Sequence, residues 1–294
     1  MRAERRDNAA ARATLSFDAL RAHAPTSTAK TWLEKDVVCY ALAAGFGRDE
    51  LDRSELPFLF EGNGLLVVPT FATMLAGPET LDDCGWNSDH VVIAARHLEV
   101  FSPLLPRDAV EISMEVVDAW PNVADAGCFI TTRCEARRDR DKRALFALTS
   151  TWLARADRID GSPRDARALP AAVRPERDPD FTVLASAEFS HSVLYRWIAA
   201  GPAWQVDTDA ARRAGFDRPT VSPDCTMGHV CKAILATVCD YDPTLLRGLS
   251  VRFASPVYAD DDLRVRMWQD GPVIAFDAVV ESRIVFDGRC ELAT

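Results

Sequence analysis

The sequence predicts an α+β protein made of two similar halves, each with a central helix followed by antiparallel strands. Two observations support this fold class: features of the chain recur at a nearly constant offset, and each half repeats the same order of helices and strands. With 294 residues, 48% hydrophobic and 27% charged, the chain has an ordinary globular composition. It is long enough for two domains of usual size.

The internal repeat is found by comparing the chain with itself at an offset of 153 residues. At this offset the following residues coincide without a gap: Val68 with Val221, Thr73 and Met74 with Thr226 and Met227, Ser102-Pro103 with Ser255-Pro256, Asp108 with Asp261, and Met114 with Met267. The shared order and spacing of these matches indicate a duplicated fold.

A connecting segment lies between the two copies. Residues 154–181 are rich in Arg, Asp and Pro and have few periodic apolar positions, which is typical of a chain that crosses the protein surface. We therefore expect an N-terminal tail at 1–29, a first half at 30–153, a linker at 154–181 and a second half at 182–294.

Each half begins with a helical stretch, at 36–47 and 190–201, and a second helix follows a proline, at 69–75 and 222–239. In the last of these, Met227, Val230, Ile234 and Val238 recur at three- and four-residue steps, which indicates one buried helix face. Runs rich in Val, Ile and Phe then alternate with Asp- and Gly-containing turns and predict antiparallel strands. Two long central helices, each wrapped by such a sheet, form a double hot-dog. We expect the two sheets to join, because pairing covers their free edges.

The charge balance excludes some partners. A formal net charge of −10 argues against a nucleic-acid surface, which needs clustered Lys and Arg. Eighteen apolar residues never run together, and the Arg-rich N-terminus has no apolar core for a secretory signal, so we expect no membrane contact and a cytoplasmic location.

Metals and nucleotide cofactors are not expected. The eight cysteines form no C-x-x-C pair and suit free thiols in a reducing compartment. Cys225 and His229 are four residues apart, but a zinc site needs three or four ligands. The Gly62 to Gly64 segment lacks the third glycine of a dinucleotide-binding turn.

The second half resembles the MaoC-like, or hydratase-2, family. Members carry a stretch like L-Y-R-L-S-G-D-x-N-P-L-H-x-D and then A-G-F-x-x-P-I-L-H-G-L-C-T-x-G, and this chain reads LYRWIAAGPAWQVDTDAARRAGFDRPTVSPDCTMGHV from Leu194. The matching residues are Leu194-Tyr195-Arg196, Asp207, Ala214-Gly215-Phe216, Pro219, Cys225-Thr226 and Gly228. The first half resembles the non-catalytic, substrate-covering half of two-part members, so the resemblance spans roughly residues 30–290. It implies a double hot-dog enzyme that acts on acyl thioesters.

The chain departs from the family at the positions that carry chemistry. The resemblance places Ala200 and Gln205 where the family has the Asp and His that bind water and move protons, and Pro202 where it has Asn. An amide cannot accept a proton near neutral pH, so Gln205 cannot be the general base. Ser222-Pro223 replaces the family's His-Gly pair, and a proline has no N–H to donate to a thioester carbonyl.

Asp224 is the first candidate for a replacement catalytic group, because it introduces a carboxylate where the family has an apolar side chain. The alternative is that Asp224 only stabilises the positive end of the helix. Gln205 and Ser222 are candidates to hold a substrate carbonyl or hydroxyl, or they are relics of the lost histidines.

The remaining candidates also have a structural alternative. His191 and His229 could approach the cleft as bases, although a lone histidine is usually structural. Tyr195 and Asp207 belong to the matched motif, and Asp207 could instead cap a loop. Trp197 and Trp204 bracket the altered motif and could narrow a substrate cavity, or could pack in the core.

Three kinds of function stay open. The first is an enzyme that acts on a thioester of coenzyme A or acyl carrier protein, in polyketide or fatty-acid biosynthesis, by elimination, isomerisation or conjugate-addition cyclisation. The second is an inactive scaffold or subunit of an active homologue, and the third is an acyl-chain binding protein. A homodimer or a homologous subunit is a further expected partner.

Overall fold

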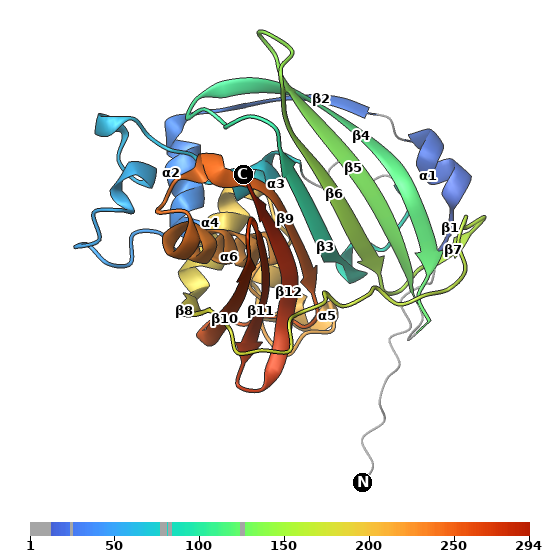
Figure 1. Ribbon diagram of the computed structural model, residues 1–294. Helices are drawn as coiled ribbons and strands as arrows, with labels where there is room; N and C mark the ends of the chain where they lie inside the picture. The colour runs from blue at the N-terminus through green and yellow to red at the C-terminus, as the bar shows by residue number, and fades with distance from the viewer. Residues whose placement is uncertain (1–12, 24–25, 77–80, 82–83, 124–126) are drawn as a thin grey trace.

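One ten-stranded antiparallel sheet forms the body of the protein in the computed structural model, which describes residues 13–23, 26–76, 81, 84–123 and 127–294 (Figure 1). The sheet order is β2-β4-β5-β6-β3-β9-β12-β11-β10-β8. The first half supplies β2 (Thr26–Trp32), β3 (Val91–Val100), β4 (Asp108–Pro121), β5 (Cys128–Arg138) and β6 (Ala144–Ala154). The second half supplies β8 (Phe181–Ala187), β9 (Leu246–Phe253), β10 (Asp261–Asp270), β11 (Val273–Val280) and β12 (Arg283–Leu292).

The two sheets join through β3 and β9, which confirms the expected edge-to-edge pairing. Counted outward from this junction, both halves have the same strand order. At the junction His97 pairs with Ser250, its own equivalent 153 residues further along, and the His97 Nδ1 and Ser250 Oγ atoms lie 2.7 Å apart. Equivalent residues that face each other across an antiparallel pair indicate a local pseudo-two-fold axis. The register therefore agrees with the internal repeat of the sequence.

The helices lie on one side of the sheet (Figure 1). They are α2 (Glu34–Ala43), α3 (Ala72–Leu75), α4 (Phe189–Ala199), α5 (Thr208–Arg213) and α6 (Pro223–Val238). Short 3₁₀ turns accompany these helices: η1 (Leu56–Phe58), η2 (Glu61–Asn63), η3 (Pro69–Phe71), η6 (Ser88–His90), η7 (Ala203–Gln205) and η8 (Pro243–Leu245).

The expectation of a long central helix in each half is correct for the second half and wrong for the first. Helix α6 has 16 residues and begins at Pro223, as expected. In the first half η3 and α3 form only a short helical segment, because Ala76 leaves the helical conformation with φ −102° and ψ 65°. The sequence continues with Gly77 and Pro78, and both residue types are unfavourable inside a helix.

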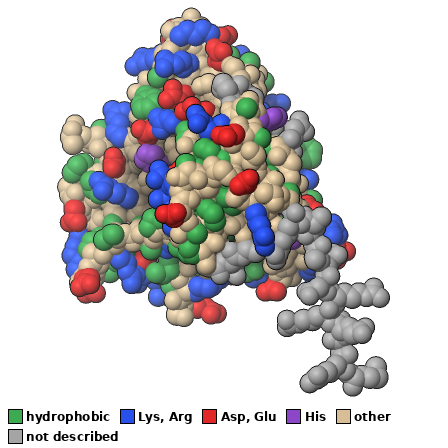
Figure 2. Space-filling model, turned by 90° about the vertical axis from the view of Figure 1, so that its right-hand side faces the viewer, with side chains coloured by type: hydrophobic (Ala, Val, Ile, Leu, Met, Phe, Trp, Pro, Cys, Tyr) green, Lys and Arg blue, Asp and Glu red, His purple; other side chains and the backbone are tan. Residues whose placement is uncertain are grey.

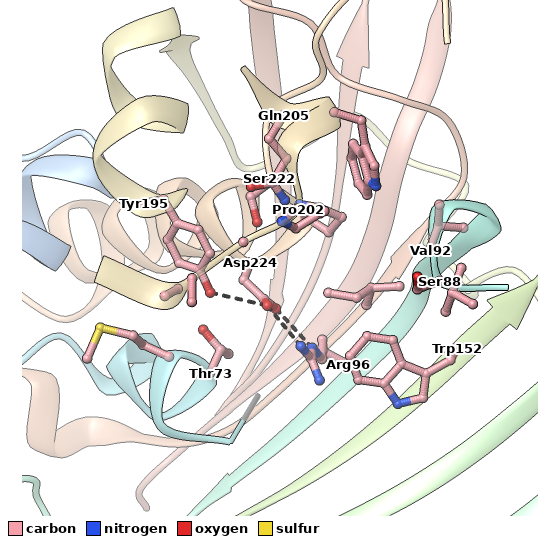
Figure 3. Close-up of a pocket in the computed structure, with 18 of the residues that line it drawn as sticks. Thr73, Ser88, Val92, Arg96, Trp152, Tyr195, Pro202, Gln205, Ser222 and Asp224 are labelled. Carbon is pink, nitrogen blue, oxygen red and sulfur yellow. Dashed lines mark hydrogen bonds and ion pairs between the residues drawn. The ribbon is translucent and has the colours of Figure 1, made fainter. Parts of the chain in front are cut away.

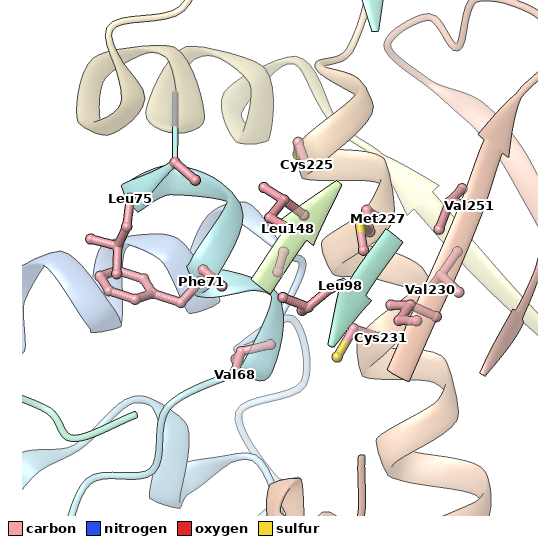
Figure 4. Close-up of a cluster of buried hydrophobic side chains, with 14 of the residues drawn as sticks. Val68, Phe71, Leu75, Leu98, Leu148, Cys225, Met227, Val230, Cys231 and Val251 are labelled. Carbon is pink, nitrogen blue, oxygen red and sulfur yellow. The ribbon is translucent and has the colours of Figure 1, made fainter. Parts of the chain in front are cut away.

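The main core lies between α6 and the sheet junction (Figure 4). Met227, Val230 and Ile234 are fully buried on one face of α6, as their spacing predicts. Leu98 of β3 and Val251 of β9 belong to the same cluster, so residues of both halves share this core.

The segments outside the two halves also pack on the fold. The expected tail contains β1 (Thr14–Ser16) and α1 (Phe17–His23), and β1 pairs in parallel with β7 (Arg158–Asp160) of the expected linker. Further along the linker, Arg174 forms an ion pair with Asp277 of β11 at 2.8 Å. The boundaries at 154 and 181 stay a prediction, although β6 ends at Ala154 and β8 begins at Phe181.

The surface is of mixed charge on the face that Figure 2 shows, where acidic and basic side chains are interspersed. No helix within the described ranges is long and apolar enough to cross a membrane.

Shortening a side chain of the shared core should weaken the whole fold. We expect Ile234→Ala to lower the free energy of unfolding by about 2–5 kcal/mol, because it removes buried methyl groups and leaves a cavity. Urea unfolding measures this, with Ala236→Ser on the exposed side of α6 as the control and an expected change within about 0.5 kcal/mol. Equal losses in the two variants would contradict the assignment of this core.

Candidate active site

A cavity of about 210 Å³ lies where the two halves meet beside the start of α6 (Figure 3). Residues from five regions line it: α3, the segment from residue 86 into β3, β6, the end of α4 with η7, and the start of α6. The lining residues are Thr73, Met74, Trp86, Ser88, Val91, Val92, Ile93, Arg96, Trp152, Tyr195, Ala199, Ala200, Gly201, Pro202, Trp204, Gln205, Ser222, Pro223 and Asp224. The cavity is smaller than the roughly 300–1,000 Å³ usual for drug-sized ligands.

Backbone irregularities shape this cavity. The pairing of β3 with β6 shifts register between Ile93 and Ala95, and such a bulge re-aims the side chains of a strand. Helix α4 ends at Ala200, which has φ 50° and ψ 38°. The left-handed conformation at Ala200 turns the chain from α4 towards η7 and so brings Pro202 and Gln205 to the cavity wall.

A buried ion pair between Arg96 and Asp224 forms one wall of the cavity (Figure 3). Arg96 Nε donates to Asp224 Oδ1 at 2.9 Å, and Arg96 Nη2 donates to Asp224 Oδ2 at 2.8 Å. The exposed fractions of the two side chains are 1% and 7%. Arg96 comes from β3 and Asp224 from α6, so this bidentate pair joins the two halves.

Further contacts complete the network around the pair. Tyr195 Oη donates to Asp224 Oδ2 at 3.2 Å, Arg96 Nη1 donates to Ser150 Oγ, and the Arg96 guanidinium lies 4.8 Å from the centre of the Trp152 ring. Burial lowers the pKa of Arg96, but the charge and hydrogen bonds of Asp224 outweigh it and leave the pKa raised. Burial likewise raises the pKa of Tyr195 well above its usual value, with the Asp224 charge adding to the rise.

The structure thus gives Asp224 a role that neither sequence-based interpretation included. Its carboxylate accepts three hydrogen bonds and its charge is matched by Arg96, so it is not a free base. It does stand in the first turn of α6, but its main contact is the guanidinium. The catalytic role expected for Asp224 therefore requires the ion pair to open first.

Gln205 and Ser222 both line the cavity, at 4% and 1% exposed. The Gln205 Oε1 atom is buried and has no hydrogen-bond partner among the described residues. It lies close to Gly201, so a Cβ built there would be 2.6 Å away and the Gln205 side chain would have to move. Ser222 occupies the N-cap position of α6, but its side chain makes no capping hydrogen bond.

The two histidine candidates lie together but do not line the cavity. The Nδ1 atom of His229 contacts the Cys225 carbonyl at 2.9 Å, so we assign the proton to that nitrogen. The Nε2 atom of His229 lies 3.1 Å from Nδ1 of His191, and the Glu188 backbone N–H donates to that same His191 nitrogen at 3.4 Å. Gly45 of the first half packs on this pair, which stabilises the contact of α4 and α6 with the first half.

Trp204 lies at the cavity, as expected, and Trp197 does not. Trp204 is buried, lines the cavity and packs against Phe216 with ring centres 5.1 Å apart. Trp197 is 82% exposed and is not a lining residue, because it lies on the outer face of α4. Asp207 caps α5 by accepting from the Ala210 N–H at 2.6 Å, which is the structural alternative considered for it. Tyr195 lines the cavity through its contact with Asp224.

Sequence reasoning missed Arg96, Trp86 and Trp152. The sequence did contain a signal for Arg96. Arg96, Leu98 and Val100 are spaced two residues apart along a strand, so Arg96 lies on the same core-facing side as the other two. A buried guanidinium requires an anionic partner. The two tryptophans pack edge to face at 6.0 Å, and their spacing in the sequence gives no hint of this contact.

Comparisons with known proteins decide the family. The model of the MaoC-like domain matches residues 190–285. An enoyl-CoA hydratase of Mycobacterium tuberculosis is 30% identical to this chain, over 86% of the chain and 89% of the relative. The chain belongs to the MaoC-like hydratase-2 family.

Other relatives agree with this family. The peroxisomal enoyl-CoA hydratase 2 of Arabidopsis thaliana is 29% identical over 90% of this chain and 91% of its own length. The crystal structure of a MaoC-like dehydratase from Phytophthora capsici superposes with a TM-score of 0.79 at 21% identity, and the match covers 94% of this chain and 97% of that one. This structural likeness supports the double hot-dog fold.

The described part of the chain contains no group of three His, Cys, Asp or Glu side chains that could hold a metal ion.

Breaking the ion pair from either side should destabilise the fold. We expect Arg96→Met and Asp224→Asn each to lower the free energy of unfolding by about 3–5 kcal/mol, because each leaves one buried charge without its partner. The double variant should lose clearly less than the sum of the two, since it leaves no uncompensated charge. Additive losses measured in urea would contradict the coupling.

The histidine pair should make stability depend on pH. Burial lowers the pKa of His229 from 6.5 to about 4 and also lowers the pKa of His191. The folded state therefore binds protons less readily than the unfolded chain, and stability should fall as pH decreases from about 6.5 towards 4. We expect a loss on the order of 2 kcal/mol from His229 between pH 7 and pH 5.

Unfolding measured at both pH values in wild type and in His191→Gln/His229→Gln provides the test. The double variant should lose less stability on acidification than wild type does, and equal losses would show that other groups cause the dependence.

Proposed function

We propose that this family member binds an acyl thioester in the cavity beside α6 and does not add water by the Asp and His mechanism that the family resemblance implies. One observation carries the proposal: the titratable side chains among the lining residues are Arg96, Tyr195 and Asp224, and Asp224 binds both of the others. A general base must be within reach of a substrate and free to accept its proton.

The start of α6 supports binding of a thioester carbonyl. The first N–H groups of a helix have no partner within the helix, and they point at a negatively polarised group. Pro223 has no N–H group, so the N–H groups of Asp224 and Cys225 are the donors that we expect to bind the carbonyl. Ser222, whose side chain makes no capping bond, adds a hydroxyl on the same side of the cavity.

A site of this kind suits reactions in which the substrate brings its own nucleophile. The site can polarise a conjugated carbonyl and hold the substrate in a reactive orientation. These two effects promote elimination, isomerisation or conjugate addition of the substrate's own hydroxyl or amine, and none of these reactions needs a protein base that activates water. We propose this lyase- or isomerase-type chemistry, in polyketide or fatty-acid biosynthesis, with coenzyme A or acyl carrier protein as carrier. The cytoplasm stays our prediction for its location, although the Arabidopsis relative is named peroxisomal.

A second candidate function is that of a non-catalytic subunit. Phe189, Val193 and Trp197 are 45%, 43% and 82% exposed and recur every four residues along α4. This spacing places them in one row on the outer face of the helix. An exposed apolar row of this kind favours contact with another protein chain, either a second copy or an active homologue.

Hydration of a short enoyl thioester tests the proposal. We expect crotonyl-CoA hydration, followed by the loss of its conjugated absorbance, to be at least about a hundredfold slower than in a typical hydratase of this family, because Gln205 cannot act as base. Restoring the two family residues with Ala200→Asp/Gln205→His should raise the rate by about 10²-fold or more. Wild-type turnover on the order of hundreds per second would show that another residue performs the proton transfer.

A further inference from the structure

A second cavity of about 280 Å³ adjoins the first one. The two share Val92, Ile93, Trp204 and Pro223 in their walls. The second cavity continues between the end of β6 and the loop that follows β9, and most of its lining is apolar: Leu153, Phe216, Val221, Phe253, Ala254, Pro256 and Val257. A charged side chain, Arg155, also lines it.

The Arg155 guanidinium is held in place by uncharged groups. Its Nη2 atom donates to the Ala214 carbonyl at 2.5 Å, and its Nε atom lies 3.4 Å from the His90 carbonyl. The ring of Phe216 lies under the guanidinium, with 4.8 Å from Cζ to the ring centre. These contacts fix its orientation and leave Nη1 without a hydrogen-bond partner among the described residues.

Arg155 differs in this respect from other buried cations of the protein. Arg96 binds Asp224, Arg138 binds Asp108 at 2.7 Å, and Lys232 binds Glu55 at 2.6 Å. No described carboxylate lies within ion-pair distance of Arg155, and burial lowers its pKa with no neighbouring charge to oppose the shift. A partly buried cation without an anion is costly, so this arrangement is typical of a site that a ligand completes.

We propose that Arg155 forms an anion subsite beside the thioester cavity, so that the natural ligand carries a carboxylate or a phosphate that reaches past Trp204 and Pro223. A guanidinium held by its neighbours is suited to bind such a group through charge-assisted hydrogen bonds. The anion has two possible sources: a carboxylate on the acyl group or a phosphate of the carrier. The proposal rests on the proposed thioester binding and adds the class of ligand.

Binding of four thioesters, measured by isothermal titration calorimetry, separates the two sources. Butyryl-pantetheine has neither group, glutaryl-pantetheine adds a carboxylate, butyryl-CoA adds phosphates, and glutaryl-CoA has both. The variants are Arg155→Met, which removes the charge, Arg155→Lys, which keeps it, and Arg212→Gln on the exposed surface of α5 as a matched control.

We expect the wild type to prefer either the carboxylate-bearing or the phosphate-bearing thioester by about tenfold or more, equivalent to one charge-assisted hydrogen bond. Arg155→Met should abolish this preference while it still binds butyryl-pantetheine, and Arg155→Lys should keep part of it. Arg212→Gln should behave as the wild type does. The preferred group identifies the source of the anion.

Unchanged preferences in folded Arg155→Met, checked by circular dichroism, would overturn the proposal, as would a wild type that binds all four thioesters equally. If Arg155→Met does not fold, folded Arg155→Lys decides instead, because lysine cannot bind an anion through two parallel hydrogen bonds. A reduced preference in this variant supports the proposal, and an unchanged preference opposes it. If the wild type binds none of the thioesters, the proposed function fails. Titration with glutarate and with inorganic phosphate then tests the anion subsite separately. Binding that depends on Arg155 supports the subsite, and binding that does not depend on Arg155 contradicts it.

Discussion

The buried ion pair between Arg96 and Asp224 is the constraint on which the site depends. It joins β3 of the first half to the start of α6 in the second half, across 128 residues of sequence. Two charges buried this deeply cost little free energy only when each of their hydrogen-bonding atoms has a partner. Tyr195 and Ser150 supply the remaining contacts. This wall of the cavity is therefore a hydrogen-bonded network that joins the two halves.

The fold does not depend on the positions at which this chain departs from the family pattern. The double hot-dog depends on the β3–β9 junction and on the apolar face of α6, and neither involves Ala200 or Gln205. Ala200 and Gln205 stand where the family resemblance implies an Asp and a His, and the backbone turn at Ala200 brings Gln205 to the cavity wall. Fold and function thus rest on different residues.

The sequence predicts the fold better than the site, for a physical reason. Periodicity reports which face of a helix is buried, so Met227, Val230 and Ile234 could be placed correctly in advance. The repeat offset likewise fits the pairing of His97 with Ser250. Partners that are distant in sequence leave no such periodic signal. The sequence marks Asp224 as a carboxylate at a position that is apolar in the family, but its contact with Arg96 depends on tertiary packing. The expectation of a long helix in the first half was wrong. The helical segment there ends just before a Gly-Pro pair, and both residue types are unfavourable inside a helix.

The central claim is that the cavity holds an acyl thioester while Asp224 stays bound to Arg96 and no protein base activates water. A crystal structure of the protein soaked with crotonyl-CoA tests this most directly, because it shows both the ligand and the ion pair. We expect an unreacted enoyl thioester with its carbonyl at the start of α6, and an intact contact between Arg96 and Asp224. A 3-hydroxybutyryl product in the cavity, or a carboxylate of Asp224 turned away from Arg96 towards the substrate, would contradict it.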